Sequence, residues 1–151
     1  LKYTACDFGR QNYRLSEVFK MNPEQPIQEP NGLTIVVSGA SGFLGMRLIK
    51  RLSLYGNKVI ALARRWPNDD ICADRDVDYI ENDLCFEKPD FGNYPDIDAA
   101  IHLAGATSGA KLDEIGYLRA NEQTTVQFCD SLSHRVGRII YASSQAVYGN
   151  P

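Results

Sequence analysis

The pattern of apolar and polar residues changes near residue 32 and is regular beyond it. Residues 33–38 are apolar or β-branched almost throughout, which is typical of a strand covered on both faces. Leucines then recur at helical spacing from Leu44 to Leu52, and the amphipathic helix that they predict ends at Gly56, a residue suited to a helix C-terminus. This region is therefore expected to begin with a strand followed directly by a helix.

The rest of the region repeats the alternation of short apolar runs and amphipathic stretches. Further strands are predicted at 58–63, 77–80, 98–103 and 138–143. A long amphipathic helix is predicted over 113–133, with inward-facing candidates Ile115, Leu118, Val126, Cys129 and Leu132. Strands that alternate with helices imply parallel pairing through right-handed crossovers. We therefore expect an α/β fold, an open, doubly wound, mostly parallel sheet with helices on both faces.

The first part of the chain has a different character. Residues 1–22 are polar and mixed, with one short helix predicted around 16–21. Three prolines between residues 22 and 32 favour an extended linker or surface arm. The alternative is a peptide that docks on a partner or on its own domain. We expect an N-terminal arm or linker of unknown role over 1–32 and one domain over 33–151.

Three glycines, Gly39, Gly42 and Gly45, lie where the first predicted strand meets its helix. A pyrophosphate can approach backbone N–H groups at a helix N-terminus only where no Cβ blocks it, and the helix dipole favours its charge. The third glycine also lets the helix pack tightly on the sheet. The turn therefore predicts a dinucleotide site; the alternative is a tight strand-to-helix turn without a ligand.

Composition narrows the class of protein without changing this prediction. The formal net charge is −3 and the basic residues form no cluster larger than a pair such as Arg64-Arg65, so a general nucleic-acid binder is not expected. No apolar run reaches the roughly 20 residues that span a bilayer. The four scattered cysteines, at positions 6, 72, 85 and 129, form no zinc or disulfide pattern. We expect a cytoplasmic protein with reduced thiols, bound to no membrane.

Five short motifs follow one another along the domain. They are Gly39-Ala40-Ser41-Gly42-Phe43-Leu44-Gly45, Asn82-Asp83-Leu84, Ile101-His102-Leu103-Ala104-Gly105, Tyr117 and Asn121 with Thr124-Thr125, and Ser143-Ser144-Gln145-Ala146-Val147-Tyr148-Gly149. In this order they resemble the extended short-chain dehydrogenase/reductase family, the NAD-dependent epimerase/dehydratase group that acts on nucleotide sugars. The resemblance covers residues 33–149, its N-terminal Rossmann portion, and nothing comparable is found over 1–32.

The resemblance implies a set of cofactor contacts. The Asp83 position contacts the adenine, and the 101–105 segment lies beside the nicotinamide ribose. With the two arginines discussed next, the cofactor-binding candidates are Gly39, Ser41, Gly42, Phe43, Leu44, Gly45, Arg64, Arg65, Asp83, Leu84, Leu103, Ala104, Gly105, Asn121 and Ser143.

The end of the second predicted strand bears on the choice of cofactor. An NAD site usually has an acidic residue there that binds the ribose hydroxyls. Here Ala63 occupies the position where the NAD-using epimerases carry aspartate, and Arg64 and Arg65 follow it. A guanidinium suits a 2′-phosphate through its charge and its paired donors. NADP is therefore favoured, while NAD bound through backbone contacts is the alternative.

The resemblance implies a Ser/Thr, Tyr and Lys catalytic set, in which Ser144 matches the hydroxyl that bonds the reacting oxygen. No tyrosine of this chain has lysine four residues on. In the family that pair follows the 143–149 motif, and the chain ends at Pro151, so we expect a chain truncated before its Tyr-x-x-x-Lys pair and its substrate-binding portion. Such a chain would bind a dinucleotide without turnover. His102, in a buried strand pattern, is expected to be a core histidine with satisfied hydrogen bonds.

The leading hypothesis for the intact protein is a nucleotide-sugar epimerase, dehydratase or reductase that uses NAD(P) and has no metal site. The resemblance also suggests a homodimer. A second hypothesis is a non-catalytic Rossmann module that senses the NADP/NADPH ratio. A third is a reductase of small non-sugar carbonyls.

Overall fold

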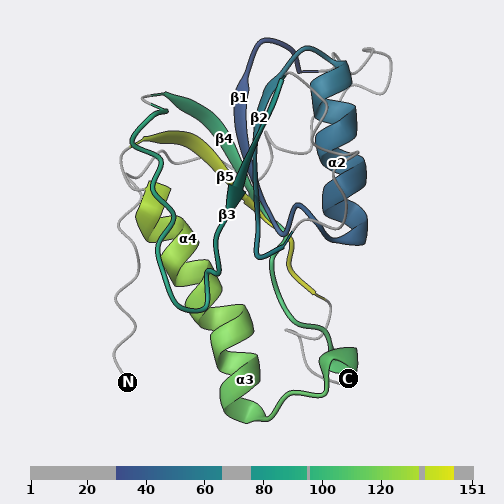
Figure 1. Cartoon of the computed structure of the whole chain (residues 1–151), viewed down its shortest axis with the longest axis vertical. Coiled ribbons are helices and arrows are strands. Elements are labelled where there is room, and N and C mark those ends of the chain that lie inside the picture. The colour runs from purple at the N-terminus through teal and green to yellow at the C-terminus, as the bar shows by residue number, and fades with distance from the viewer. Residues whose placement is uncertain (1–29, 66–75, 95, 133–134, 145–151) are drawn as a thin grey trace, which may run out of the picture.

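The computed structural model describes residues 30–65, 76–94, 96–132 and 135–144, and they form a parallel sheet with helices on both faces (Figure 1). The helix expected around 16–21 lies outside the described residues, as does most of the N-terminal arm. The strands are β1 (Thr34–Ser38), β2 (Lys58–Ala63), β3 (Val77–Glu81), β4 (Ile97–His102) and β5 (Val136–Tyr141). All four strand pairs are parallel, in the spatial order β3-β2-β1-β4-β5. The order reverses beside β1, which confirms the doubly wound fold.

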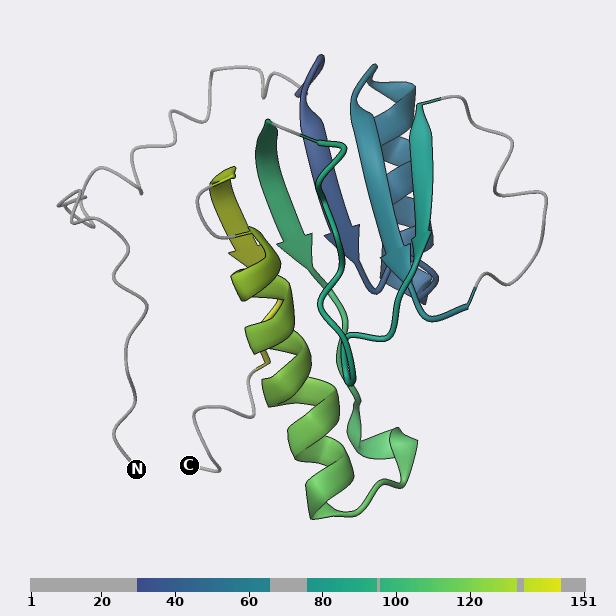
Figure 2. The ribbon, with the colours of Figure 1, turned by 60° about the vertical axis from the view of Figure 1, so that its left-hand side comes forward.

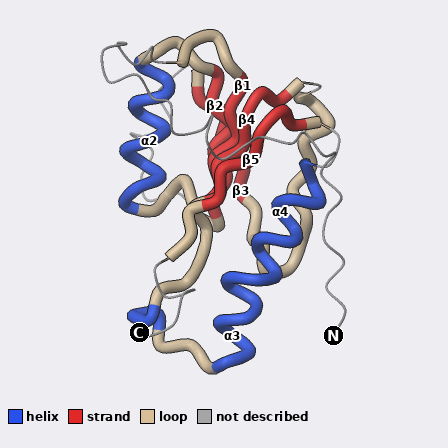
Figure 3. Tube along the Cα trace, turned by 180° about the vertical axis from the view of Figure 1, so that it is seen from behind, coloured by secondary structure: helices blue, strands red, loops and turns tan. Residues whose placement is uncertain are grey.

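The helices lie on opposite faces of the sheet (Figure 2). Helix α2 (Phe43–Leu54) covers one face. The other face is covered by a longer helical stretch, composed of α3 (Glu114–Leu118), a π-helical segment (Arg119–Gln123) and α4 (Thr124–Leu132), as Figure 3 shows from behind. A single 3₁₀ turn, η2 (Ser108–Ala110), interrupts the loop between β4 and α3.

The central strands are buried because helices cover both of their faces. Val36 and Val37 on β1, and Val59, Ile60 and Ala61 on β2, are all 0% exposed. Consecutive residues of a strand point to opposite faces, so each strand contributes to two cores. One core packs on Phe128 and Leu132 of α4 and contains Val36, Ile60, Leu62, Leu84, Phe91, Ile97 and Ala100. The other packs on Ile49 and Leu52 of α2 and contains Ile35, Val37, Ala40, Val59, Ala61 and Val77.

Helix α2 ends at a turn that one buried amide holds together. Gly56 has φ +75°, the left-handed conformation that glycine adopts easily after a helix. The next residue, Asn57, is fully buried; its Nδ2 donates to the Leu52 carbonyl at 2.9 Å and its Oδ1 accepts from the Leu33 N–H at 3.1 Å. Asn57 Nδ2 also donates to the Pro30 carbonyl at 2.7 Å. The end of the helix is therefore tied to the start of β1.

The inward face predicted for the 113–133 helix is wrong for most of its length. Ile115, Leu118 and Val126 are 60%, 51% and 52% exposed, while Phe128 is fully buried. The π-helical segment explains the error, because its wider turn contains one residue more than an α-turn and rotates the residues that follow relative to a uniform helix. Of the inward candidates, Leu132 is buried and Cys129 half-buried.

Candidate functional site

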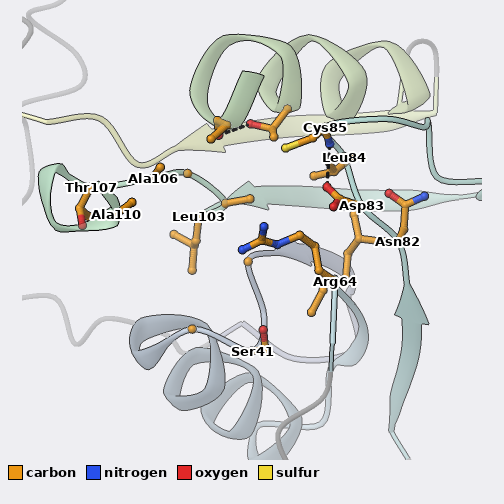
Figure 4. A pocket seen from close by; sticks show the side chains of 18 of the residues that line it. Ser41, Arg64, Asn82, Asp83, Leu84, Cys85, Leu103, Ala106, Thr107 and Ala110 are labelled. Carbon is orange, nitrogen blue, oxygen red and sulfur yellow. Dashed lines mark hydrogen bonds between the residues drawn. The ribbon is translucent and has the colours of Figure 1, made fainter. Parts of the chain in front are cut away.

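A cavity of about 660 Å³ opens at the carboxyl ends of the strands, where the strand order reverses between β1 and β4 (Figure 4). In open parallel sheets this is the place where ligands bind. The residues that line it come from the end of β2, from the segments that follow β1, β2, β3 and β4, and from the helical stretch after β4. Nine of the candidates from the sequence line it, namely Gly39, Ser41, Gly42, Arg64, Asp83, Leu84, Leu103, Ala104 and Gly105.

The glycine turn forms one wall, and its shape depends on the absence of side chains. Gly39 has φ +68°, and a Cβ on it would lie 2.7 Å from the backbone nitrogen of Ala104 at the end of β4. A Cβ on Gly45 would overlap the Gly39 carbonyl and lie 2.7 Å from the Cα of Ala40. Gly45 is thus required by the close approach of the helix to its own turn, which is a more local reason than the expected contact with the sheet.

The N-terminus of α2 faces the cavity without a competing acceptor. Its N-cap is Gly42, no side chain caps it, and its first turn contains no acidic residue. The first-turn N–H groups of a helix have no acceptor within the helix, so they present donors and a positive dipole end. Ser41 and Gly42 line the cavity beside them. This wall is therefore suited to an anionic group such as a phosphate.

Arg64 and Asp83 lie at one end of the cavity, where β2 and β3 finish. Figure 4 shows the guanidinium of Arg64 reaching into the space between Ser41 and Asp83. Asp83 is held by its own turn, because its Oδ1 accepts from the Cys85 N–H at 3.0 Å. A cation and a fixed carboxylate thus line the same cavity, a combination suited to the donors and anionic groups of a nucleotide.

Cys85 also lines the cavity but is not an activated nucleophile. Burial, followed by the hydrogen bond and negative charge of Asp83, raises the pKa of its thiol, although Arg64 and Arg119 act in the opposite direction. Its Sγ lies 3.8 Å from the Arg119 carbonyl oxygen, to which it can donate a weak hydrogen bond. The thiol therefore stays protonated near neutral pH, and the side chain contributes shape to the wall.

The segment after β4 forms the opposite wall, and Asn121 fixes it in place. The Asn121 Oδ1 accepts from the Ala106 N–H at 2.8 Å, and its Nδ2 donates to the Ala106 carbonyl at 3.3 Å. A Cβ on Gly105 would come within 2.9 Å of the same Oδ1. Both ends of the amide of Asn121, which the sequence predicts to be a cofactor contact, bond to the backbone of Ala106.

His102 lies beneath this segment and is 1% exposed. Its Nδ1 is 2.6 Å from the Ser38 Oγ and its Nε2 is 3.1 Å from the Thr125 Oγ1. Its ring stacks on Phe128 with the centroids 4.8 Å apart. Burial lowers its pKa from 6.5 to about 4, so the imidazole is neutral at neutral pH. The expectation of a core histidine with satisfied hydrogen bonds is confirmed.

The other candidates from the sequence lie outside the cavity wall. They are Phe43, Leu44, Gly45, Arg65, Asn121, Ser143 and Ser144. Ser143 and Ser144 come shortly after β5 and are exposed, and Arg65 is an exposed residue after β2. The motif residues 145–149 lie outside the described residues.

Several lining residues were not among the candidates. They are Leu62, Ala63, Asn82, Cys85, Ala106, Thr107, Gly109, Ala110, Leu112, Ala120 and Thr124. Asn82 and Thr124 already belong to the recognised motifs, and Ala63 directly precedes Arg64. Extending the motifs by one residue would have found Cys85 and Ala106. The loop that contains η2 carries no such signal, because only the fold brings it to the cavity.

Within the described parts of the chain, no group of three or more histidine, cysteine or acidic side chains is placed to hold a metal ion. Among the helices described, none is long and apolar enough to cross a membrane.

Comparison with known proteins gives a consistent family. The sequence model of the NAD dependent epimerase/dehydratase family matches residues 35–151. ADP-L-glycero-D-manno-heptose-6-epimerase of Cupriavidus pinatubonensis is 30% identical over 123 residues, which are 78% of this chain and 37% of that protein. The enzyme of the same name from Nitratidesulfovibrio vulgaris is 26% identical over 122 residues. The chain thus spans about 37% of the length of these curated relatives.

Solved structures share the fold. MoeE5 in complex with UDP-glucuronic acid and NAD superposes with a TM-score of 0.65 at 28% identity, over 78% of this chain and 39% of that one. A UDP-galactose 4-epimerase superposes with a TM-score of 0.65 at 22% identity, over 78% and 40%. The Bordetella bronchiseptica enzyme WbmG, in complex with NAD, superposes with a TM-score of 0.67 at 18% identity, over 83% and 42%.

The family model covers well over half of the chain, and it begins within the strand that leads into the glycine turn. This agrees with the parallel sheet, the reversal of strand order beside β1 and the cavity at that point. The chain belongs to the NAD dependent epimerase/dehydratase family.

Proposed function

We propose that the intact protein is an NAD(P)-dependent nucleotide-sugar epimerase, dehydratase or reductase, and that these residues form its cofactor-binding part. The observation that carries the proposal is the uncapped N-terminus of α2 beside Gly39 and Gly42, facing a cavity of about 660 Å³. The pyrophosphate of a dinucleotide would accept hydrogen bonds from this turn. A Cβ on Gly39 would lie against the backbone of Leu103 and Ala104, so glycine is required for the turn to keep this shape beside the cavity.

The walls of the cavity give the dinucleotide a direction. The adenosine would lie toward Arg64 and Asp83, at the ends of β2 and β3, and the nicotinamide toward the segment after β4. Leu103, Ala104 and Gly105 line the cavity there, and the small residues Ala104 and Gly105 would allow close approach of a flat ring. These assignments agree with the order of the family motifs along the chain.

The bound cofactor would supply a hydride acceptor or donor next to the substrate. The chain's own contribution to the chemistry in these residues is Ser144, whose hydroxyl would hydrogen-bond the reacting oxygen of a sugar. Ser144 follows β5, beside the end of β4. The Tyr-x-x-x-Lys pair of the family, which moves the proton, has no counterpart in this sequence. We therefore expect turnover to require a tyrosine and a lysine outside these residues.

NADP is the favoured cofactor. Arg64 reaches into the cavity at the end of β2, and the preceding residue, Ala63, offers no carboxylate to the ribose hydroxyls. A 2′-phosphate would meet a guanidinium there and no competing acid from β2. The NAD bound to MoeE5 and to WbmG makes NAD the alternative for this chain.

The test compares Arg64→Asp with Arg65→Asp in the protein expressed from its complete reading frame. Arg65 is the matched control because it is adjacent, exposed and absent from the cavity wall. We expect Arg64→Asp to weaken NADPH binding relative to NADH by on the order of 10-fold, measured by calorimetry, since a charge-assisted contact is worth roughly 1.5–3 kcal/mol. Equal effects of the two substitutions would remove Arg64 from the NADP assignment. Failure of the unchanged protein to bind either dinucleotide would remove the whole proposal.

Nucleotide sugars are the proposed substrate class. The relatives are named as epimerases of ADP-heptose and UDP-galactose, and MoeE5 contains UDP-glucuronic acid. These names give no support to a non-catalytic NADP sensor or to a reductase of small non-sugar carbonyls. A cytoplasmic location belongs to the same proposal.

A homodimer is also part of the proposal. Ile115, Leu118 and Val126 expose apolar surface on the helical stretch from α3 to α4, away from the core. Such a surface is suited to association with a second copy. Sedimentation of the protein with and without Val126→Asp would test it, because a charge in the contact should shift the mass from dimer to monomer.

A further inference from the structure

The hydroxyl of Thr125 determines which nitrogen of His102 carries the proton. Thr125 Oγ1 lies 2.6 Å from the Asn121 carbonyl, which is an acceptor only, so the single hydroxyl hydrogen is donated there. The same oxygen lies 3.1 Å from the Nε2 of His102. Having no second hydrogen, it accepts in this contact. His102 therefore carries its proton on Nε2, and its Nδ1 has only a lone pair.

The other side of the ring completes a directed chain of hydrogen bonds. Ser38 and His102 are register partners on β1 and β4, so their side chains lie side by side. The Leu103 N–H donates to the Ser38 carbonyl at 3.2 Å and also to the Ser38 Oγ at 3.3 Å. This Oγ lies 2.6 Å from the unprotonated Nδ1, to which it donates. The relay thus runs from the Leu103 N–H through Ser38, His102 and Thr125 to the Asn121 carbonyl.

Both ends of this relay reach the cavity wall. Leu103 lines the cavity at the end of β4. Asn121 holds Ala106, which lines it a few residues further on, through both atoms of its amide group. The π-helical segment interrupts the regular backbone hydrogen bonds of the helix, and threonine hydroxyls donate to carbonyls there. Thr125 Oγ1 does so to the Asn121 carbonyl, and Thr124 Oγ1 to the Ala120 carbonyl at 2.9 Å. Ser38 and His102 are buried and Thr125 is half-buried. Water therefore does not replace a hydrogen bond of the relay when one of these side chains is removed.

We infer that His102 is a positioning residue: the Ser38–His102–Thr125 relay sets the Leu103–Ala106 segment at the distance from α4 that the dinucleotide requires. His102 touches no ligand itself. Ser38, His102 and Thr125 each have one side-chain or carbonyl acceptor to donate to in a single protonation state of the ring. In that state the ring is neutral and its proton is on Nε2. The inference rests on the proposed function, because the segment that it positions is the proposed nicotinamide wall.

The first experiment reads the ring without any ligand. Long-range proton–nitrogen spectra of the protein distinguish a protonated ring nitrogen from an unprotonated one. We expect the resonances of His102 to show a protonated Nε2 and an unprotonated Nδ1 at neutral pH. A proton on Nδ1 would overturn the inference. This result is independent of the cofactor, so it separates the relay from the proposed function.

The second experiment measures dinucleotide affinity in Thr125→Val, Thr125→Ser and Ser131→Ala. Valine keeps the branched shape without the hydroxyl, whereas serine keeps the hydroxyl. Ser131 is the matched control, because its Oγ also donates to a carbonyl of α4, that of Phe128 at 2.7 Å. Loss of one buried hydrogen bond should weaken binding by about 5-fold in Thr125→Val and by less than about 2-fold in the other two.

Folding is controlled by measuring thermal unfolding of all three variants. If Thr125→Val lowers affinity only in proportion to a loss of folded protein, or if Thr125→Ser fails to restore the affinity, His102 and its partners are ordinary core groups and the inference is overturned. If the unchanged protein binds neither NADH nor NADPH, the positioning role fails together with the proposed function, while the ring-nitrogen spectra still decide the direction of the relay.

Discussion

The backbones of Gly39 and Ala104 lie so close together that one added methyl group would force them apart: a Cβ on Gly39 would lie 2.7 Å from the Ala104 backbone nitrogen. Gly39→Ala should therefore cost more than the strain of a left-handed conformation, which is about 1–2 kcal/mol for an L-residue. The free energy of unfolding from urea titration measures the cost. We also expect the displaced turn to lose most of its affinity for a dinucleotide.

Gly56→Ala is the matched control for this substitution. Gly56 has φ +75°, but a Cβ on it would meet nothing within 4 Å. The two variants share the backbone strain and differ in the overlap with the backbone of Leu103 and Ala104, just after β4. Gly39→Ala should be at least about 1 kcal/mol less stable than Gly56→Ala, because backbone atoms cannot move aside as a flexible side chain can. Equal losses would mean that the segment after β4 moves aside and that the close approach is not required.

Gly105 and Asn121 should be energetically coupled. A Cβ on Gly105 would lie 2.9 Å from the Asn121 Oδ1, which holds Ala106. Gly105→Ala should lower stability in the unchanged protein, yet cost less in an Asn121→Ala background, where the opposing atom is gone. A double-mutant cycle of unfolding free energies would give a coupling on the order of 1 kcal/mol. Additive losses would show that Asn121 shifts freely and does not fix the loop.

His102 makes folding stability depend on pH. Its pKa falls from 6.5 to about 4 on burial, so the unfolded chain binds a proton between these values that the folded chain excludes. Stability is therefore fully present above pH 6.5 and declines by about 3 kcal/mol as the pH falls toward 4. Unfolding free energies measured across this range would show the slope.

The control for the pH dependence is His102→Gln, which can still donate to Thr125 but does not titrate. This variant should be less stable at neutral pH and lack the slope between pH 6.5 and 4. Asp78 does not confuse the result: the hydrogen bond from Lys58 lowers the pKa of its carboxyl below 3.8, so its contribution is lost only at lower pH. An unchanged slope in His102→Gln would assign the effect to another group.

The sequence predicts the fold because its signals are local and agree with one another. The strand at Thr34–Ser38, the glycine turn and the helix that ends before Gly56 each follow from neighbouring residues, and the structure confirms them. β5 begins two residues before the predicted 138–143 and ends at Tyr141, because the ladder with β4 starts at Val136, ahead of the apolar run on which the prediction rested. The glycines and Arg64 line the cavity for the same local reason, as each directly follows a strand.

Other parts of the site could not be predicted because they depend on contacts between distant segments. The clamp of Asn121 on Ala106 and the contact of Ser38 with His102 join residues that are 15 and 64 positions apart. The motif that contains Asn121 indicates a residue near the cavity, but it does not indicate that Asn121 bonds to Ala106. The η2 loop reaches the cavity only through the path of the chain from β4 to α3.

The helical stretch that follows this loop buries a different face in the structure from the one that the sequence pattern predicts. A uniform helix over 113–133 would bury Val126, whereas the π-helical segment rotates α4 so that Phe128 is 0% exposed and Val126 is 52% exposed. Phe128→Ala should lower the free energy of unfolding by about 3–5 kcal/mol through the cavity that it leaves. Val126→Ala should change it by less than about 0.5 kcal/mol. The free energies are measured by chemical denaturation at low protein concentration, so that association through Val126 does not contribute. A larger loss in Val126→Ala than in Phe128→Ala would support the uniform helix. It would also argue against the π-helical segment that places Asn121 at Ala106.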